Sequence, residues 1–505
     1  MNKHSGTPNQ YPGRTYLLFD DLHIERQEGV EPVLCNPVKE PLPVLKPEKP
    51  WEGSSVHLNS AFLYDQEEKL FKLWYAAHDP QAHPELGYPC RPAYAVSADC
   101  RDWQRPNLGL TQWRGNTDNN LVRMPPIGGG ALLGGMVKDT RETDPQKRYK
   151  AMDASRRIRR PEEPEIWIRG TRLSAGKLTG GLTLGFSADG LDWRVQDDWL
   201  MSGAEIMDAS FLQGWDDRLS KWVIWARCRA EFQKMGKYRT YGLILTDDLE
   251  QMSYPVATLV PDGNDPPGMQ FDHFRSFPVS EGYVGLVTAM HTDPIDAYRM
   301  EVQLCYSRDL LVWDRAYRKP YLPAGECGTW DDMYIIAAAP VLVGDTIHIL
   351  YAGHNLGNGS HLRVGGQTKV FDNGDRLPDG RTAGGAIGLA TLKKDRWVAR
   401  QSLRNHGVLQ TRPLYCARGA LEVNADASGG SLRAELVDHM GRPVEGFTRA
   451  DCDPVTADSL AHTVTWRGNA DFSKIIGDSY HYPKVSRILA VRFYLEEAKL
   501  FSFAF

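Results

Sequence analysis

The sequence lacks the features that mark several large classes of protein. No apolar run approaches the ~18–20 residues of a membrane-spanning helix, and the N-terminal stretch MNKHSGTPNQYPGRTYLLFDD has no apolar core of a secretory signal. The eight cysteines include no CxxC pair, so neither a zinc site nor a disulfide framework is expected. We therefore predict a cytoplasmic protein with reduced thiols, no cofactor, no bound metal and no membrane partner.

Charge and composition exclude further classes. The net charge is −5 and no basic stripe is present, which argues against a nucleic-acid partner. With 505 residues, 42% of them hydrophobic and 24% charged, the chain has the composition of a globular protein of two or three domains. Its 14 Trp and 21 Tyr suit β-sheet cores and also stack well on sugar faces. The composition leaves a homo-oligomer open.

Helical periodicity is scarce, and a short turn motif repeats along the chain instead. Its copies are SADCRDW at 97–103, SADGLDW at 187–193 and SRDLLVW at 307–313, with a degenerate copy, TDDLEQM, at 246–252. In each copy the Ser or Thr and the Asp can cap a tight turn through their side-chain oxygens. The tryptophan then begins the next strand on its buried face.

A pair of strands joined by a short polar hairpin accompanies these turns. Examples are AFLYDQEEKLFKLWYAA and APVLVGDTIHILYAG, and five such units start near residues 54, 129, 204, 271 and 333. Repeated units of about four strands are what a β-propeller needs, because one blade cannot bury both of its faces alone. We predict an all-β fold with a five-bladed β-propeller.

The repeat stops near residue 400, and the remaining segments alternate apolar and polar residues, as in LRAELVDHMGRPVEGF. This pattern favours a C-terminal β-sandwich. The predicted domains are therefore a Pro-rich N-terminal strap wrapping the propeller at 1–50, the propeller at 51–400 and the sandwich at 401–505.

The pattern resembles the invertase, levanase and inulinase group, glycoside hydrolase family thirty-two, and its relatives. The residues that carry the resemblance are the S-x-D-G-x-x-W turns, the strands KLFKLWY and TIHILYAG, the stretch IGLATLKKDRWV and the tail segments GVLQTRPL and AKLFSFAF. The resemblance covers roughly residues 16–505. It implies a five-bladed propeller followed by a β-sandwich and activity on a carbohydrate.

The catalytic motifs of that family are replaced here. Where the family carries an Asn-Asp-Pro-Asn-Gly type motif, this sequence reads GSSVHLNSAFLYD, with His57 and Asn59 but no acid before Asp65. Asp65 belongs to a hairpin turn, where we expect a solvated cap. The Arg-Asp-Pro motif of the second blade is also missing, and Glu326-Cys327 matches the family's Glu-Cys motif in the wrong blade. The family's catalytic residues are therefore not transferred.

Candidate catalytic acids lie where inner strands begin, because these positions converge at the axial funnel of a propeller. Glycoside hydrolysis needs one carboxyl group to protonate the leaving oxygen and a second as nucleophile or base. Blade three supplies Glu205 and Asp208, blade four supplies Asp272, and the loop GECGTWDDMYI before blade five supplies Glu326 and Asp332. For that loop, an ordinary polar turn is an equally good interpretation.

Further polar and aromatic residues at the same strand starts are candidates for binding a substrate. For Trp330 a blade-packing role, and for His354 a structural role, are alternative interpretations. The candidates are His57, Asn59, His273, Arg275, Trp330, Asp331 and His354.

The sequence supports three hypotheses about function. The first is an exo-acting glycoside hydrolase for a terminal furanosyl-type (fructosyl or arabinosyl) or related sugar, with an oligosaccharide or glycoside as its partner. The second is a glycoside phosphorylase, or a transferase forming or opening cyclic sugars; Arg227 and Arg275 would then bind phosphate. The third is a noncatalytic carbohydrate-binding propeller, in which Asp208 and Asp272 would be dispensable.

Overall fold

The structure is a computed structural model of the whole chain. It describes residues 15–58, 61–79, 90–124, 135–158, 166–168, 171–173, 178–196, 201–202, 210–232, 236–292, 297–358, 360–403, 406–416, 418–438, 440–475 and 488–505.

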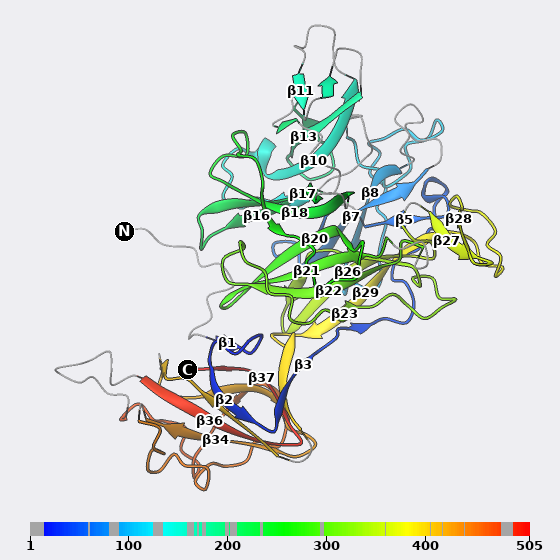
Figure 1. The fold of residues 1–505 in the computed structure, drawn as a ribbon. Helices are drawn as coiled ribbons and strands as arrows, with labels where there is room; N and C mark the ends of the chain where they lie inside the picture. The colour runs from blue at the N-terminus through cyan, green and yellow to red at the C-terminus, as the bar shows by residue number, and fades with distance from the viewer. Residues whose placement is uncertain are drawn as a thin grey trace. The chain divides into compact units, whose positions relative to one another are not determined.

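Regular structure in these segments is almost entirely β-strand, as predicted (Figure 1). The helical turns described are two short 3-10 turns, η1 (Pro50–Glu52) and η3 (Pro145–Lys147). Within the described segments, no helix is long and apolar enough to cross a membrane. The chain forms two compact units. The larger comprises Pro37–Phe277 and Val284–Thr391, and the smaller comprises Met1–Asn36, Pro278–Tyr283 and Leu392–Phe505.

Five antiparallel sheets follow one another along the larger unit, from blue to yellow in Figure 1. The first contains β5 (Val56–His57), β6 (Phe62–Asp65), β7 (Leu70–His78) and β8 (Cys90–Ser97). The second contains β9 (Met136–Lys138), β10 (Tyr149–Ile158), β13 (Leu178–Ser187), β14 (Arg194–Val195) and β15 (Met201–Ser202). The third contains β16 (Phe211–Asp216), β17 (Lys221–Phe232), β18 (Gly236–Thr246) and β19 (Val256–Leu259).

The last two sheets complete the set. The fourth contains β20 (Gln270–Val279), β21 (Gly282–Met290), β22 (Met300–Ser307) and β23 (Pro320–Leu322). The fifth contains β24 (Tyr334–Ala337), β25 (Val341–Val343), β26 (Thr346–His354), β29 (Gly385–Lys393) and β4 (Val38–Lys39). Two separate hairpins are β11 (Ile166–Ile168) with β12 (Thr171–Leu173), and β27 (His361–Val364) with β28 (Gln367–Val370).

Each sheet packs against two neighbours, so the five sheets form a closed five-bladed propeller. One core joins the first and second sheets around Trp74, and another joins the second and third around Ile224. Trp225 of the third sheet meets Phe274 of the fourth edge-on, with ring centroids 4.6 Å apart. A single core then contains residues of the fourth, fifth and first sheets, including Met300, Leu350 and Tyr75. The predicted fold class is confirmed.

The ring is closed by a strand from the beginning of the chain. β4 pairs with β29 and forms the outer edge of the fifth sheet, with Lys39 opposite Ala390. The first element of the propeller is therefore part of its last blade.

The repeated turn motif has the predicted chemistry. In the second blade the Asp189 carboxylate accepts from Ser187 Oγ at 3.0 Å and from the backbone N–H of Leu191 at 2.8 Å. The fourth residue of the motif has a positive φ, at Cys100, Gly190 and Leu310. Its carbonyl accepts from the indole of the motif's own tryptophan in all three copies.

Asp65 caps a hairpin turn as predicted, but the expectation that it is solvated is wrong. Its Oδ1 accepts from the backbone N–H of Glu67 at 3.0 Å. Its Oδ2 accepts from Lys72 Nζ at 2.9 Å and from Lys138 Nζ at 2.8 Å, and only 2% of the residue is exposed. Lys138 comes from the second blade, so the carboxylate is buried by a neighbouring sheet that sequence spacing does not place.

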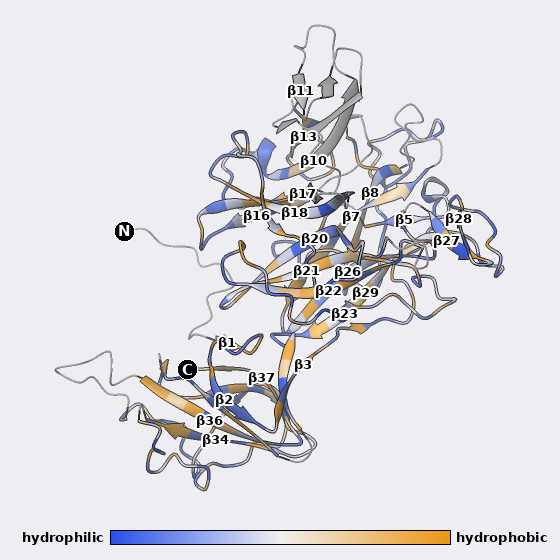
Figure 2. Cartoon of the chain, in the orientation of Figure 1, coloured by the Kyte–Doolittle hydropathy of each residue, from blue (hydrophilic) through white to orange (hydrophobic). Residues whose placement is uncertain are grey.

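The smaller unit is a β-sandwich. One sheet contains β1 (Thr15–Leu17), β3 (Val30–Leu34), β30 (Val398–Ser402), β33 (Glu422–Asp426), β35 (Asp458–Thr463) and β37 (Lys499–Ala504). The other contains β2 (Ile24–Glu28), β31 (Gly407–Thr411), β32 (Leu414–Tyr415), β34 (Ser431–Val437) and β36 (Ile488–Glu496). Orange apolar residues run along β34 and β36 (Figure 2). They pack with Leu500 and Phe503 of β37 in a core shared by both sheets.

The N-terminal segment differs from the strap expected at 1–50. β1, β2 and β3 pair with β37, β31 and β30 of the sandwich, whereas β4 and Leu45 pair with β29 of the propeller. Backbone pairing explains the difference, because each of these short stretches completes the edge of a sheet and satisfies its N–H and C=O groups there.

Gly190 gives a test of blade packing. Its φ is +80°, its carbonyl accepts from the Trp74 indole at 2.7 Å, and a Cβ would lie 2.8 Å from Trp74 Cζ2. We expect Gly190→Ala to lower the free energy of unfolding by roughly 2–5 kcal/mol, from backbone strain plus overpacking. Gly109, with φ +67° and no atom within 4 Å of a Cβ, is the control, and its Ala variant should lose about 1–2 kcal/mol in denaturant titrations. Equal losses would contradict the packing role.

Candidate active site

The starts of the inner strands bring together buried polar side chains from three blades. Asp272 and His273 lie near the start of β20, His57 ends β5, and Tyr334 begins β24. His354 ends β26 and is directly opposite Tyr334 in the sheet register. We call these five residues the axial cluster. The positions follow from topology, because every inner strand of the ring begins at the same end.

Asp272 is the most heavily bonded member of the axial cluster. Its Oδ1 accepts from Arg227 Nη1 at 2.8 Å, from Arg239 Nη1 at 2.5 Å and from Asn358 Nδ2 at 3.3 Å. Its backbone carbonyl accepts from Tyr241 OH at 2.6 Å. Burial alone would raise the pKa of this carboxyl, but the two arginines and His273 outweigh it and hold the pKa far below its usual range. Asp272 is therefore an anion at neutral pH.

The other oxygen of Asp272 fixes the tautomer of His273. His273 Nδ1 lies 2.8 Å from Asp272 Oδ2. Burial lowers the pKa of His273 to about 4 although the adjacent carboxylate favours the charged ring. An ionised carboxylate can only accept, so Nδ1 carries the proton, and Nε2 of the neutral ring carries a lone pair. The pair is thus an oriented imidazole base next to a fixed negative charge.

His57 is neutral as well. Burial, reinforced by His273 and His354, lowers its pKa to about 3. Its Nε2 is 2.9 Å from Tyr334 OH, while its buried Nδ1 has no hydrogen-bond partner among the described residues. A buried ring nitrogen in this state costs free energy, because it has lost its contact with water and has gained no hydrogen bond among the described residues.

His354 has both ring nitrogens occupied. The backbone N–H of Leu356 donates to Nδ1 at 2.9 Å, so the neutral ring must donate from Nε2 to Asn373 Oδ1 at 2.8 Å. Burial lowers its pKa to about 4. These bonds hold the histidine in place, which is the structural role left open by the sequence.

Arg275 lies on the same side of β20 as His273, as the strand alternation predicts. The ring of Phe211 is 5.5 Å from the His273 ring, and the Arg275 guanidinium carbon lies 3.1 Å from its centroid. Arg275 donates to the Phe274 carbonyl at 3.1 Å, and burial lowers its pKa to about 9.

Within the stretch GECGTWDDMYI, the polar loop at 325–332 stands apart from the axial cluster in its bonding, whereas Tyr334 at the end of the stretch belongs to the cluster and bonds His57. Glu326 is exposed, and Trp330 stacks on Tyr351 with ring centroids 5.7 Å apart, which is the blade-packing role. Asp331 bonds Lys39 of β4, and Asp332 Oδ2 accepts from Arg381 at 2.9 Å. No hydrogen bond or ion pair between described residues joins this loop to Asp272, so the geometry favours its interpretation as a structural turn.

Three predicted site residues, Asn59, Glu205 and Asp208, lie outside the described residues. Sequence reasoning missed Arg239, Tyr241 and Asn358, which all bond Asp272. The spacing of Arg239 and Tyr241 by two on a strand places them on one face, and that signal could have found them. Asn358 follows a strand in a loop, where no sequence pattern selects it.

No group of three or more His, Cys, Asp or Glu side chains among the described residues is arranged to hold a metal ion.

Neither a scan of the sequence against protein-family models nor a search of curated proteins found a match. Among solved structures, the chain is similar to a GH32 β-fructofuranosidase of Bombyx mori at 12% identity and a TM-score of 0.38, over 94% of this chain and 93% of that one. It is similar to a β-fructofuranosidase of Schwanniomyces occidentalis at 9% identity and a TM-score of 0.39, over 93% and 97%. It is also similar to an N-acetylgalactosamine deacetylase of F. plautii at 15% identity and a TM-score of 0.39, over 72% and 96%. At such identities the function has to be argued from this chain's own site.

The neutral histidines predict an acid-sensitive fold. Each has a pKa of about 3 or 4 when folded, below the ~6.5 of an unfolded chain, so the unfolded state takes up more protons as pH falls. The contribution of these histidines to the free energy of unfolding is fully present above pH ~6.5. It should fall as pH drops toward 4, by up to about 1.4 kcal/mol per pH unit for each histidine. Denaturant titrations at pH 7, 6 and 5 should show a shallower fall for His354→Gln than for wild type.

His406 supplies the control, since it is exposed and lies outside the axial cluster. His406→Gln should keep the wild-type pH dependence. An unchanged slope in His354→Gln would show that this ring is not buried neutral in solution.

Proposed function

We propose that the chain is a carbohydrate-active enzyme, a glycoside hydrolase that binds a terminal sugar at the axial cluster. The observation that supports this most is the buried Asp272–His273 pair beside His57, where inner strands converge. Such a site offers a base, donors and acceptors for hydroxyl groups, and little water.

His273 is the proposed general base. Its Nε2 lone pair takes a proton from a water molecule, and the water oxygen attacks the anomeric carbon as the bond to the leaving oxygen breaks. Asp272 is a positioning residue in this scheme, because both of its oxygens are already bonded and its low pKa prevents it from donating a proton. Its charge stabilises the imidazolium that forms.

The leaving oxygen needs a proton from an acid. Asp208, which precedes β16 in the sequence and lies outside the described residues, is the proposed donor. Arg239 and Asn358, which both bond Asp272, supply further N–H donors for sugar hydroxyls. A closed funnel suits a chain end better than a long groove, so we propose an exo-acting enzyme for furanosyl-type sugars.

Hydrolysis assays on a panel of substrates test the proposal. The panel contains aryl glycosides and oligosaccharides with fructosyl, arabinofuranosyl, galactosyl and xylosyl ends, each with and without phosphate. We expect turnover of one furanosyl substrate, a loss of about 10²–10⁴-fold in kcat for His273→Gln, and a similar loss for Asp208→Asn. In wild type, kcat/KM should fall as pH drops below about 4, where His273 takes up a proton.

Asp217→Asn is the control, because Asp217 is exposed in a hairpin turn. It should keep wild-type kcat and KM. If no substrate turns over while calorimetry still detects sugar binding, the noncatalytic propeller replaces this proposal. Turnover that requires phosphate would replace hydrolysis by phosphorolysis.

A further inference from the structure

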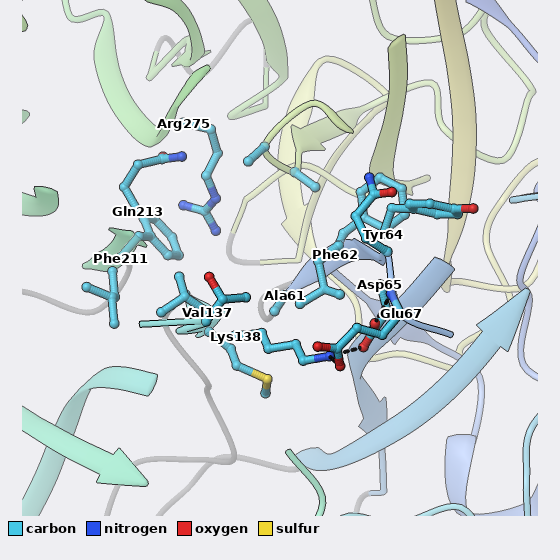
Figure 3. Close-up of a pocket in the computed structure, with 18 residues that line it drawn as sticks. Ala61, Phe62, Tyr64, Asp65, Glu67, Val137, Lys138, Phe211, Gln213 and Arg275 are labelled. Carbon is cyan, nitrogen blue, oxygen red and sulfur yellow. Dashed lines mark hydrogen bonds and ion pairs between the residues drawn. The ribbon is translucent and has the colours of Figure 1, made fainter. Parts of the chain in front are cut away.

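The propeller contains a partly open axial cavity of about 350 Å³. Residues in or next to the inner strands of all five blades line it, including Ala61, Val137, Phe211, Arg275 and Ala338. One water molecule needs only about 10–15 Å³ of such space, so the cavity can hold a small ligand together with several waters. Figure 3 shows its lining side chains.

The charges on one side of this cavity are neutralised by the protein. Lys138 donates to Asp65 and to Glu67, each at 2.8 Å, and Asp65 also bonds Lys72 (Figure 3). These carboxylates and ammonium groups satisfy one another.

Arg275 on the other side is not neutralised in this way. It is 6% exposed, and its bonds among the described residues are one to the Phe274 carbonyl and a stacking contact with Phe211. Within the described residues, no carboxylate pairs with it. A guanidinium has five N–H donors, and a buried charge without a counter-charge costs several kcal/mol. Several N–H donors and the positive charge of Arg275 therefore lie at the cavity without a partner carboxylate among the described residues.

Gln213 adds a second set of donors beside Arg275. Its Oε1 accepts from the backbone N–H of Ser276 at 3.2 Å, which fixes the amide and directs the NH₂ group away from that bond. Gln213 also lines the cavity, near the guanidinium (Figure 3). A planar guanidinium next to an amide NH₂ is an arrangement that binds oxyanions through charge-assisted hydrogen bonds.

We propose that Arg275 and Gln213 form a binding site for a small oxyanion, a phosphate or a carboxylate, inside the axial cavity. The anion supplies the counter-charge that Arg275 lacks among the described residues. The two sources of such a group are free phosphate and the carboxylate of an acidic sugar. This proposal does not depend on the proposed hydrolase activity, because anion binding is measured without turnover.

Isothermal titration calorimetry of the full chain tests the site. Sodium phosphate and sodium glucuronate are the probes, in chloride buffer of constant ionic strength at pH 7. Wild type should bind at least one of them at a single site. Arg275→Met should weaken that binding by about 10- to 100-fold, and Gln213→Leu by about tenfold, which are the effects of losing hydrogen bonds to a charged group. Arg101→Met, at an exposed arginine outside the cavity, should bind as wild type does.

The two probes distinguish the sources. Phosphate alone binding would assign the site to free phosphate, and glucuronate alone would assign it to an acidic sugar. The proposal fails if neither binds wild type, or if Arg275→Met binds as tightly as wild type. Phosphate binding that appears only in Asp208→Asn would also overturn it, by showing that a protein carboxylate is the counter-charge. If Arg275→Met does not fold, Arg275→Lys and Gln213→Leu with unchanged unfolding midpoints serve instead.

Discussion

A β-sheet with two apolar faces must be covered on both of them, and this constraint determines the larger unit. Among the described residues, each of its five sheets buries its faces against two others. Ring closure then brings the starts of the inner strands together. Asp272 and His57, far apart in sequence, become electrostatic neighbours for that reason. The last contact of the ring comes from β4, whose Lys39 bonds Asp331 and lies 4.9 Å from the centre of the Tyr351 ring.

Burial disfavours the charged form of every acid and base at the axis, and the neighbours of each group decide the outcome. It keeps the three histidines neutral, whereas Asp272 stays charged because two arginines and an imidazole surround it. The neutral His273 imidazole can thus lie next to the ionised Asp272 carboxylate, and the Nδ1 proton stays on the imidazole. Arg275 is close by on Phe211 and carries a positive charge that no described carboxylate balances. The Phe211 ring therefore contacts the His273 base as well as the Arg275 guanidinium.

The repeating parts of the fold were predictable from sequence because local chemistry specifies them. The Ser-x-Asp turns use side-chain caps within seven residues, and the hairpin aspartates behave as caps at Asp65, Asp144 and Asp216. Positions set by other blades were not predictable. The burial of Asp65 needs Lys138, the pairing of β1–β3 needs strands of the sandwich, and the bonds of Asp272 need Arg239 and Asn358 from other elements. The sequence predicted the site residues that lie at the starts of inner strands. It did not predict which side chains form hydrogen bonds with them.

The closing strand has a consequence for synthesis. Lys39 and Asp331 are 292 residues apart in the chain, and Asp331 precedes the other four strands of the fifth sheet, β24, β25, β26 and β29. At about 5–20 residues per second, a ribosome needs roughly 15–60 s to make the intervening chain. During that interval β4 has no partner strand and the first blade has one uncovered face. The ring therefore closes only after its last blade has been synthesised, late in translation.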